Sequence, residues 1–492
     1  MQDIGKRMAK GATWMVLFTL LQRCLGLVST IILARLLVPA DFGLVAMGTS
    51  IFAALEIVST FSFDLALIQN QEAAGRHYDT AWTFNVIFGL INTTALLILA
   101  APAALFFAEP RVESVMHVLA VCAFISSFDN IGVVGFQKEI EFHKEFRLGI
   151  AKKLAGFVVT VTIAWLWRSY WALLAGMLAG RITATALSYV MHPYRPHFSL
   201  AAARELLHFS KWLLINNVLI FINYRGVDFV IGKVAGPQAL GLYSVAYEIS
   251  NLPTTELVFP ISRAVFPGYS KIAGDVPRLR SAFLDVIALI ALITVPAGAG
   301  IWIVAEPMVH VVLGPRWVDA IPLIEILAVF GVIRTLYGPT GSVYLALGKP
   351  QLVTYVHAIF ISVAVSLLFL LIPTYGLVGT AWAVVVAASV CMPVSYSLVM
   401  RELKLPLASL ARALWRPLVS AALMLVIGHW LHTRWLAPVG FGQNLQGLFI
   451  LVAICAAVYC AGVLSCWWLA RCPSGAESAL VALIKLRLSE PT

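Results

Sequence analysis

The chain has 492 residues, of which 61% are hydrophobic and only 12% are charged. A soluble protein of this composition would expose far more apolar surface than water tolerates, which excludes the soluble globular class. The formal net charge of +10 fits basic residues in short cytoplasmic loops, so we expect no nucleic-acid partner. The seven cysteines lie in or beside apolar runs without metal-ligand spacing, and we expect neither a metal or other cofactor nor a disulfide framework.

Apolar runs of about 20 or more residues recur along the sequence, and such runs predict membrane-spanning helices. They cover residues 12–38, 42–68, 80–107, 112–136, 148–168, 170–192, 211–235, 239–266, 282–305, 318–347, 351–373, 376–400, 409–431 and 445–470. The charged stretch 137–147 predicts a short helix at the membrane surface. The fold class is therefore predicted to be an all-α polytopic membrane protein with about 14 transmembrane helices.

The loops between these runs predict an orientation. With the N-terminus in the cytoplasm, about 23 lysines and arginines lie on the cytoplasmic side and about five on the other side. This asymmetry follows the positive-inside rule, and an even number of spans places the C-terminus in the cytoplasm as well. Each predicted outer loop is too short for a catalytic domain, so we expect a transporter and not an enzyme.

The first pair of spans has a partner 198 positions later in the sequence. Two lobes with a site between them are a common plan for secondary transporters, so we predict two pseudo-repeated lobes around a central cavity. The predicted parts are an N-terminal lobe at 1–192, a cytoplasmic linker at 193–210, a C-terminal lobe at 211–400, and two additional helices with a tail at 401–492. The register pairs Trp14 with Trp212, Arg35 with Lys233, Pro39 with Pro237, Gly43 with Gly241 and Leu44 with Leu242.

Short motifs follow one another in a fixed order between about residues 5 and 400. They include ILARLLVPADFGL at 32–44, ALIQ at 66–69, YWAL at 170–173, FS at 209–210, GPQALGLYSVAY at 236–247, ISRAVFP at 261–267, LGPRW at 313–317 and ALGKP at 346–350. Together they resemble the polysaccharide-transporter (Wzx, and especially WzxC-like) family of oligosaccharide flippases within the MOP superfamily. One departure is Arg168-Ser169-Tyr170, where relatives often have a Gly-Tyr-Gly-like turn.

The resemblance implies a two-lobed bundle that alternates between inward-open and outward-open forms. It implies a flippase that moves an undecaprenyl-diphosphate-linked oligosaccharide from the inner to the outer leaflet of the bacterial cytoplasmic membrane. The product would serve capsule, exopolysaccharide or O-antigen (lipopolysaccharide) assembly. The implied partners are the lipid-linked oligosaccharide, membrane lipids, and the polysaccharide polymerase and export machinery.

Four arginines lie near the centre of predicted spans: Arg23, Arg181, Arg225 and Arg334. A guanidinium at this depth costs roughly 2.5–3.5 kcal/mol, so each is expected to face a partner or a watery cavity. Because the planar fork of arginine makes two charge-assisted hydrogen bonds to phosphate, we predict that these residues bind the substrate diphosphate. Arg23 and Arg225 come from the first helices of the two lobes, and we expect them to hold the diphosphate from opposite lobes.

A structural interpretation of these residues stays open, because each arginine can instead pair with a buried acid and tie helices together. Asp228 stands three positions after Arg225 on the same helix face. Gly176 and Gly180, before Arg181, are typical of a tight helix contact. The candidate acids for ion coupling or for salt bridges are Glu56, Asp64, Asp228 and Glu256.

Two other functions compete with the flippase interpretation. A drug or cation exporter of the related MATE type would favour acids and aromatic residues over arginines near the bilayer centre. A membrane glycan polymerase or ligase, from a different class of protein, would need a large outer loop with catalytic residues. The four central arginines and the short outer loops favour the flippase.

Overall fold

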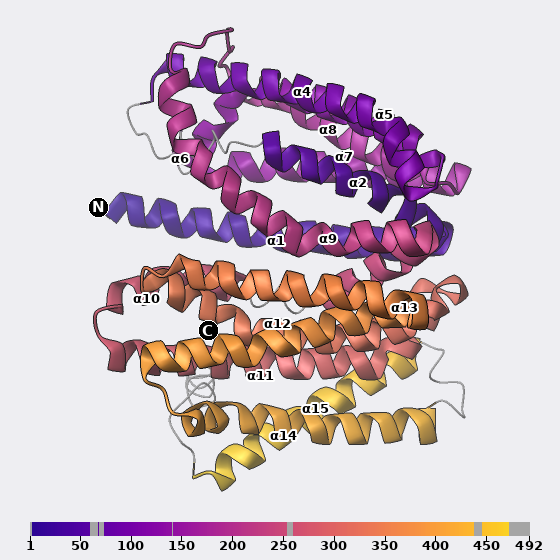
Figure 1. Cartoon of the computed structure of the whole chain (residues 1–492), viewed down its shortest axis with the longest axis vertical. Helices are drawn as coiled ribbons and strands as arrows, with labels where there is room; N and C mark the ends of the chain where they lie inside the picture. The colour runs from indigo at the N-terminus through magenta and orange to yellow at the C-terminus, as the bar shows by residue number, and fades with distance from the viewer. Residues whose placement is uncertain are drawn as a thin grey trace, which may run out of the picture. The chain divides into compact units, whose positions relative to one another are not determined.

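The structure is a computed structural model that describes residues 2–59, 67, 73–139, 141–252, 259–436 and 445–471. Every regular element within these residues is a helix, which confirms the predicted all-α class (Figure 1). The chain divides into two compact units, Met1–Gly241 and Leu242–Thr492, called unit 1 and unit 2 below. The predicted lobes, with a linker at 193–210, were defined by the sequence repeat, whereas these units are defined by packing. The predicted lobe limits therefore stay a prediction.

Unit 1 is built mainly from long helices. They are α1 (Gln2–Leu36), α2 (Pro39–Ser59), α4 (Gly75–Phe107), α5 (Arg111–Ser127), η1 (Ile131–Val134), α6 (Gly135–Lys138), α7 (Phe142–Trp167), α8 (Trp171–Met191) and the first part of α9 (Ala203–Ser250). Helix α7 packs against α8 and α1, and α4 packs against α5 (Figure 1). The expected surface helix at 137–147 is wrong, because residues 142–147 form the first turns of α7. Lys144 pairs with Glu141 at 2.6 Å there, so the polar start of α7 is neutralised locally.

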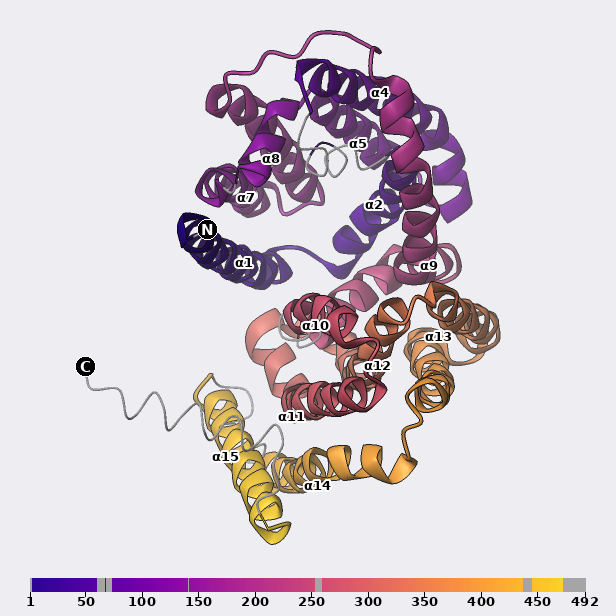
Figure 2. The ribbon, with the colours of Figure 1, turned by 90° about the vertical axis from the view of Figure 1, so that its left-hand side faces the viewer.

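Unit 2 contains the remaining helices. They are α10 (Phe259–Ile272), α11 (Val276–Met308), η3 (Val309–Leu313), η4 (Pro315–Ala320), α12 (Ile321–Ala346), α13 (Pro350–Leu403), α14 (Leu407–Leu431), η5 (His432–Leu436) and α15 (Leu445–Leu469). Helix α12 packs between α11 and α13, and α14 and α15 pack on α11 (Figure 2). The core of this unit includes the fully buried rings of Phe283 and Tyr344.

Two of the helices are interrupted by glycines in the left-handed region. Gly236 in α9 has φ 80° and Gly376 in α13 has φ 58°, a conformation that glycine adopts without a Cβ clash. Helix α13 therefore holds two predicted spans, and α9 holds one predicted span and the start of the next, divided as the sequence indicated. The described residues contain ten helices long and apolar enough to cross a membrane, or eleven if the bent pair Arg111–Ser127 and Ile131–Lys138 forms one span.

The outer surfaces of these helices are apolar. Large hydrophobic side chains such as Leu105 (80% exposed), Val190 (80%) and Phe449 (69%) point away from the packed interior of their units. Water would oppose such exposure, whereas lipid chains are an apolar solvent that accepts it. The protein is therefore a multi-pass membrane protein, as its composition indicated.

A close backbone crossing joins α2 to α9 within unit 1. A Cβ on Gly43 would stand 1.6 Å from the Pro237 carbonyl oxygen, and a Cβ on Gly241 would stand 1.8 Å from the Pro39 carbonyl oxygen. The contact is reciprocal, because the 198-position register exchanges its two halves. It pairs Gly43 with Gly241 and Pro39 with Pro237, so each glycine meets the proline of the other repeat. This local symmetry supports the internal duplication.

A strap of residues 192–202 connects α8 to α9 and lies along α4. The Tyr194 hydroxyl and the His197 backbone amide both donate to Asp79 Oδ1, at 2.7 and 2.9 Å. Asn130 Nδ2 donates to the Tyr194 carbonyl oxygen at 2.7 Å. Further strap amides donate to hydroxyl oxygens on α4, from Ser199 to Thr83 and from Ala202 to Thr80. The strap is thus fastened to unit 1 along its length.

Candidate functional site

Arg181 forms an ion pair with an acid from another helix. It stands midway along α8, and its Nη2 lies 3.7 Å from Glu56 Oε1 on α2. The two side chains are 27% and 47% exposed, so a ligand has access to the pair. A strong charge-assisted hydrogen bond is shorter than about 3 Å, so the Arg181–Glu56 contact is a longer ion pair. The structure therefore brings together two of the residues predicted from the sequence.

A second acid reaches the same region from a broken helix. Helix α5 ends at Ser127, and the chain turns by 72° before η1 and α6 continue. Asp129 lies at this break and accepts a hydrogen bond from Thr185 Oγ1, one turn beyond Arg181 on α8. The backbone amide of Asn130 donates to Ser188 Oγ at 2.9 Å, so α8 fixes the break at two points. Interrupted helices often build the binding sites of transporters.

Glycines bring α7 and α8 into close contact. A Cβ on Gly176 would stand 2.8 Å from the Gly156 carbonyl oxygen, and a Cβ on Gly180 would stand 3.4 Å from the Lys152 carbonyl oxygen and 3.8 Å from Lys152 Cγ. The tight contact expected from the two glycines of α8 is therefore present. It places Lys152 beside the residue that precedes Arg181.

Four charged residues consequently gather in unit 1. Lys152 interacts electrostatically with Arg181, Asp129 and Glu56, and these contribute charges of both signs from α2, the α5 break, α7 and α8. Sequence reasoning selected neither Lys152 nor Asp129 as a site residue. The available signal for Lys152 was its position inside the predicted span 148–168. We call Glu56, Asp129, Lys152 and Arg181 the unit 1 charge cluster.

Arg334 has a different setting in unit 2. Its Nη1 donates to the Tyr247 hydroxyl at 2.6 Å, and its guanidinium carbon lies 5.8 Å from the ring centroid of Phe330. The Tyr247 ring stacks on Tyr243 at 6.0 Å and packs against Phe330 at 6.2 Å. A hydroxyl and aromatic faces thus orient this guanidinium, and cation–π attraction stabilises its charge.

The remaining predicted residues are placed less fully. Arg23 lies on α1 with its side chain exposed. Asp228 is buried in α9, with 8% of its surface exposed. The backbone of Arg225 is helical, but its side chain lies outside the described part of the chain, as do Asp64 and Glu256. The suggested pairing of Arg225 with Asp228 stays a prediction.

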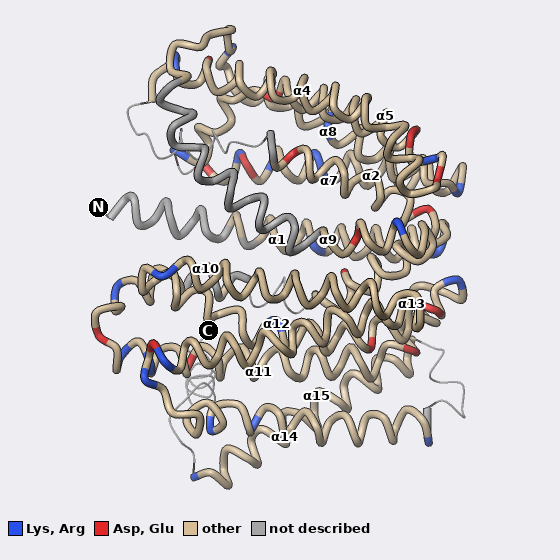
Figure 3. The backbone as a smooth tube through the Cα atoms, in the orientation of Figure 1, with Lys and Arg blue, Asp and Glu red and all other residues tan. Residues whose placement is uncertain are grey.

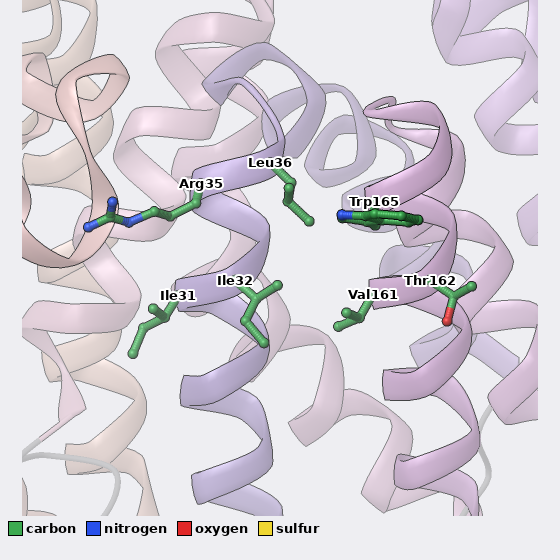
Figure 4. Close-up of a pocket in the computed structure, with 7 residues that line it drawn as sticks. All are labelled: Ile31, Ile32, Arg35, Leu36, Val161, Thr162 and Trp165. Carbon is green, nitrogen blue, oxygen red and sulfur yellow. The ribbon is translucent and has the colours of Figure 1, made fainter.

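Within the described residues, a groove of about 550 Å³ lies between α1 and α7. Figure 4 shows that Leu36 and Trp165 face each other across it, whereas the guanidinium of Arg35 extends away from Trp165. The groove thus offers apolar surface without an inward-facing charge. Its seven lining residues are Ile31, Ile32, Arg35, Leu36, Val161, Thr162 and Trp165.

Charge is unevenly distributed along the helices. In Figure 3 most lysines, arginines and acids lie near helix ends and connections, and the middle portions of the helices are largely uncharged. Helix α13 has no lysine, arginine or acid between Pro350 and Met400. The unit 1 charge cluster is therefore set among helices whose middle portions are otherwise largely uncharged.

Solved structures share this architecture. The lipid II flippase MurJ, in an inward closed conformation, matches with a TM-score of 0.73 at 15% identity over 92% of this chain and 98% of that chain. An inward-facing multidrug resistance MATE transporter matches with a TM-score of 0.61 at 18% identity over 78% of this chain and 96% of that chain. The chain therefore shares the fold of these two membrane transporters.

The sequence defines the family within that class. Residues 32–322 match the polysaccharide biosynthesis protein family, and the chain belongs to it. It is 28% identical to the lipopolysaccharide biosynthesis protein WzxC of Escherichia coli (strain K12), over 70% of this chain and 71% of that protein. It is 24% identical to the teichuronic acid biosynthesis protein TuaB of Bacillus subtilis (strain 168), over 87% of this chain and 89% of that protein. The resemblance drawn from the motifs is confirmed.

Proposed function

We propose that this protein is a flippase that moves a lipid-linked oligosaccharide from the inner to the outer leaflet for capsule, exopolysaccharide or O-antigen synthesis. The family supports this proposal, since WzxC, TuaB and the succinoglycan biosynthesis transport protein ExoT of Rhizobium meliloti are similar chains named for polymer synthesis or transport. The carrier lipid is undecaprenyl diphosphate. Both termini face the cytoplasm, and polymerase and export machinery take up the product at the outer leaflet.

The observation that carries the proposal is the presence of cations inside the spans of each unit. Arg181 and Lys152 stand within α8 and α7, and Arg334 stands within α12. A diphosphate cannot enter hydrocarbon without compensation, because transfer of an unpaired charge into an apolar medium is prohibitively costly. Cations that are already oriented by neighbours reduce that cost for an anionic head group.

The mechanism is alternating access with contacts from both lobes. A carrier changes form only if its ligand binds the two forms with different free energies, so closing one face must bring new contacts to the bound anion. Arg23 and Arg225, on the first helices of the two predicted lobes, make these contacts in our proposal. Each forked contact to phosphate contributes roughly 1.5–3 kcal/mol.

Deletion of the gene tests the function directly. The lipid-linked oligosaccharide should accumulate in the inner leaflet, and expression of the wild-type chain should restore polymer export. At equal membrane amounts, Arg23→Ala should lose nearly all export, whereas Arg23→Lys keeps the charge without the fork and should retain part of it.

Three results would contradict the proposal. Accumulation of the intermediate in the outer leaflet would indicate a polymerase or ligase. Unchanged lipid intermediates together with altered drug sensitivity would indicate an exporter of the MATE type. Normal export by Arg23→Ala would remove that residue from the mechanism.

A further inference from the structure

The acids of the unit 1 charge cluster differ in how firmly each is held. Asp129 sits at the fixed break after α5 and accepts the Thr185 hydroxyl. Glu56 approaches Arg181 only to 3.7 Å, and its side chain is 47% exposed. The Asp129 carboxylate is therefore anchored by a neighbouring helix, whereas the Glu56 carboxylate is accessible and makes a longer ion pair with Arg181.

The cations of the cluster complement each other as phosphate ligands. Arg181 offers a planar fork that matches two phosphate oxygens, and Lys152 offers a compact point charge with three donors. The glycine contact between α7 and α8 holds both on adjacent helices. Lys152 is exposed and Arg181 is 27% exposed, so neither is sealed away from a ligand. The positive charges of Lys152 and Arg181 repel each other, and an anion bound between them offsets this repulsion.

The balance of charges in the unit 1 charge cluster determines how a diphosphate can bind there. With the site empty, Glu56 and Asp129 neutralise Lys152 and Arg181, which avoids leaving uncompensated cations within a span. A diphosphate brings additional negative charge, so one carboxylate must withdraw as the phosphate binds. Glu56, whose ion pair with Arg181 is 3.7 Å long, meets that requirement, whereas Asp129, which the Thr185 hydroxyl holds, does not.

We propose that Lys152 and Arg181 bind the diphosphate of the lipid-linked substrate within unit 1. Glu56 is the carboxylate that the phosphate displaces from Arg181, and Asp129 remains as the fixed counter-charge. This inference rests on the proposed function and gives it a site at residue level, including a lysine that sequence reasoning did not select. It also makes binding an exchange of anions, in which the phosphate takes the place of the Glu56 carboxylate beside Arg181.

Binding measurements on the purified full-length chain in lipid nanodiscs test the site. The probe is radiolabelled undecaprenyl diphosphate, displaced either by the unlabelled lipid or by inorganic diphosphate. Lys152→Met and Arg181→Met should each weaken lipid binding about tenfold or more, because each removes a charge-assisted contact. Glu56→Gln should tighten binding about threefold, because the competing carboxylate loses its charge. Lys153→Met is the matched control, as it removes the adjacent lysine of α7 and should change affinity less than about twofold.

Each outcome bears on a defined part of the proposal. Equal affinity of Lys152→Met and wild type would overturn the site while leaving the proposed function intact, whereas failure of the wild type to bind the lipid would refute the proposed function. Inorganic diphosphate should displace the labelled lipid from the wild type and should no longer displace it from Lys152→Met. If inorganic diphosphate still displaces the lipid from Lys152→Met, the phosphate binds elsewhere. Lys152→Arg keeps the charge and should bind more tightly than Lys152→Met. Equal losses in both variants would indicate a packing role.

Discussion

The two sequence repeats are alike where backbones meet and different where charges lie. At the crossing of α2 and α9, Gly43 accommodates the Pro237 carbonyl and Gly241 accommodates the Pro39 carbonyl. In their interiors, unit 1 gathers acids and cations from four segments, whereas unit 2 holds Arg334 with a tyrosine hydroxyl and aromatic rings. The backbone geometry of a duplicated scaffold is constrained by close approach, while its polar side chains are free to diverge. We therefore expect the two repeats to contribute unequally to substrate binding.

The largest effects should come from the shared crossing. Gly43→Ala and Gly241→Ala each place a methyl group closer to a carbonyl oxygen than van der Waals contact allows, so the two backbones must separate. The cost should exceed the roughly 1–3 kcal/mol typical of overpacking, and folded protein in the membrane should fall sharply for both variants. Gly26→Ala is the control, because nothing lies within 4 Å of its Cβ position. Size-exclusion chromatography of the solubilised protein measures the result, and normal yields for Gly43→Ala would disprove the reciprocal contact.

Two variants in unit 2, with smaller expected effects, should distinguish the charge of Arg334 from the orientation of its guanidinium. Arg334→Met removes the cation and should abolish most polymer export, whereas Tyr247→Phe removes only the 2.6 Å hydrogen bond that orients it. A hydrogen bond to a charged group contributes roughly 1.5–3 kcal/mol, so Tyr247→Phe should keep partial export. Arg316→Met, an exposed residue of η4, controls for loss of a positive charge. Full export by Arg334→Met would show that transport does not need the charge of Arg334.

The strap gives a test confined to unit 1. Asp79→Ala removes the acceptor of the Tyr194 hydroxyl and the His197 amide, and hydrogen exchange at the His197 amide should accelerate about tenfold if roughly 1.4 kcal/mol of protection is lost. Asp79→Asn keeps an oxygen acceptor and should show a smaller acceleration. Unchanged exchange in Asp79→Ala would mean that other contacts hold the strap.

The smallest predicted effect depends on pH. His192, which follows α8, has its pKa lowered from the ordinary value of 6.5 by burial, and its Nδ1 accepts the Tyr194 amide at 3.2 Å. A histidine with a lowered pKa favours folding while neutral, so its contribution is complete above pH 6.5 and declines as the pH falls below that value. Nearby Glu139 and Glu141 oppose the shift, and Lys144 and Arg195 reinforce it.

Hydrogen exchange at the Tyr194 amide measures this pH effect. After correction for intrinsic rates, the amide should lose protection between pH 7.5 and pH 5.5 in the wild type, with the change centred below 6.5. His192→Asn lacks the titrating ring and should show a flat profile. A matching loss of protection in His192→Asn would assign the pH dependence to another group.

Sequence reasoning recovered the scaffold because membrane insertion constrains it directly. Apolar runs, the break at Gly236 and the pairing of Gly43 with Gly241 are properties of length, backbone and register, and the structure places them as expected. Asp129 and Lys152 were not selected for the site because their meeting depends on a 72° turn after α5 and on the packing of α7 against α8. Neither feature leaves a periodic signal in the sequence. The roles of Arg23, Arg181, Arg225 and Arg334 in binding stay predictions for the same reason.

The central claim is tested most directly by leaflet transfer in proteoliposomes. Purified protein is reconstituted with a labelled lipid-linked oligosaccharide, and an external glycosidase reports the fraction of sugar exposed on the outer leaflet over time. Wild-type vesicles should expose the inner pool progressively, and Lys153→Met vesicles should do the same. Vesicles with both Lys152→Met and Arg181→Met should remain near the protein-free rate. A wild-type rate no faster than that of protein-free vesicles would contradict the assignment as a flippase.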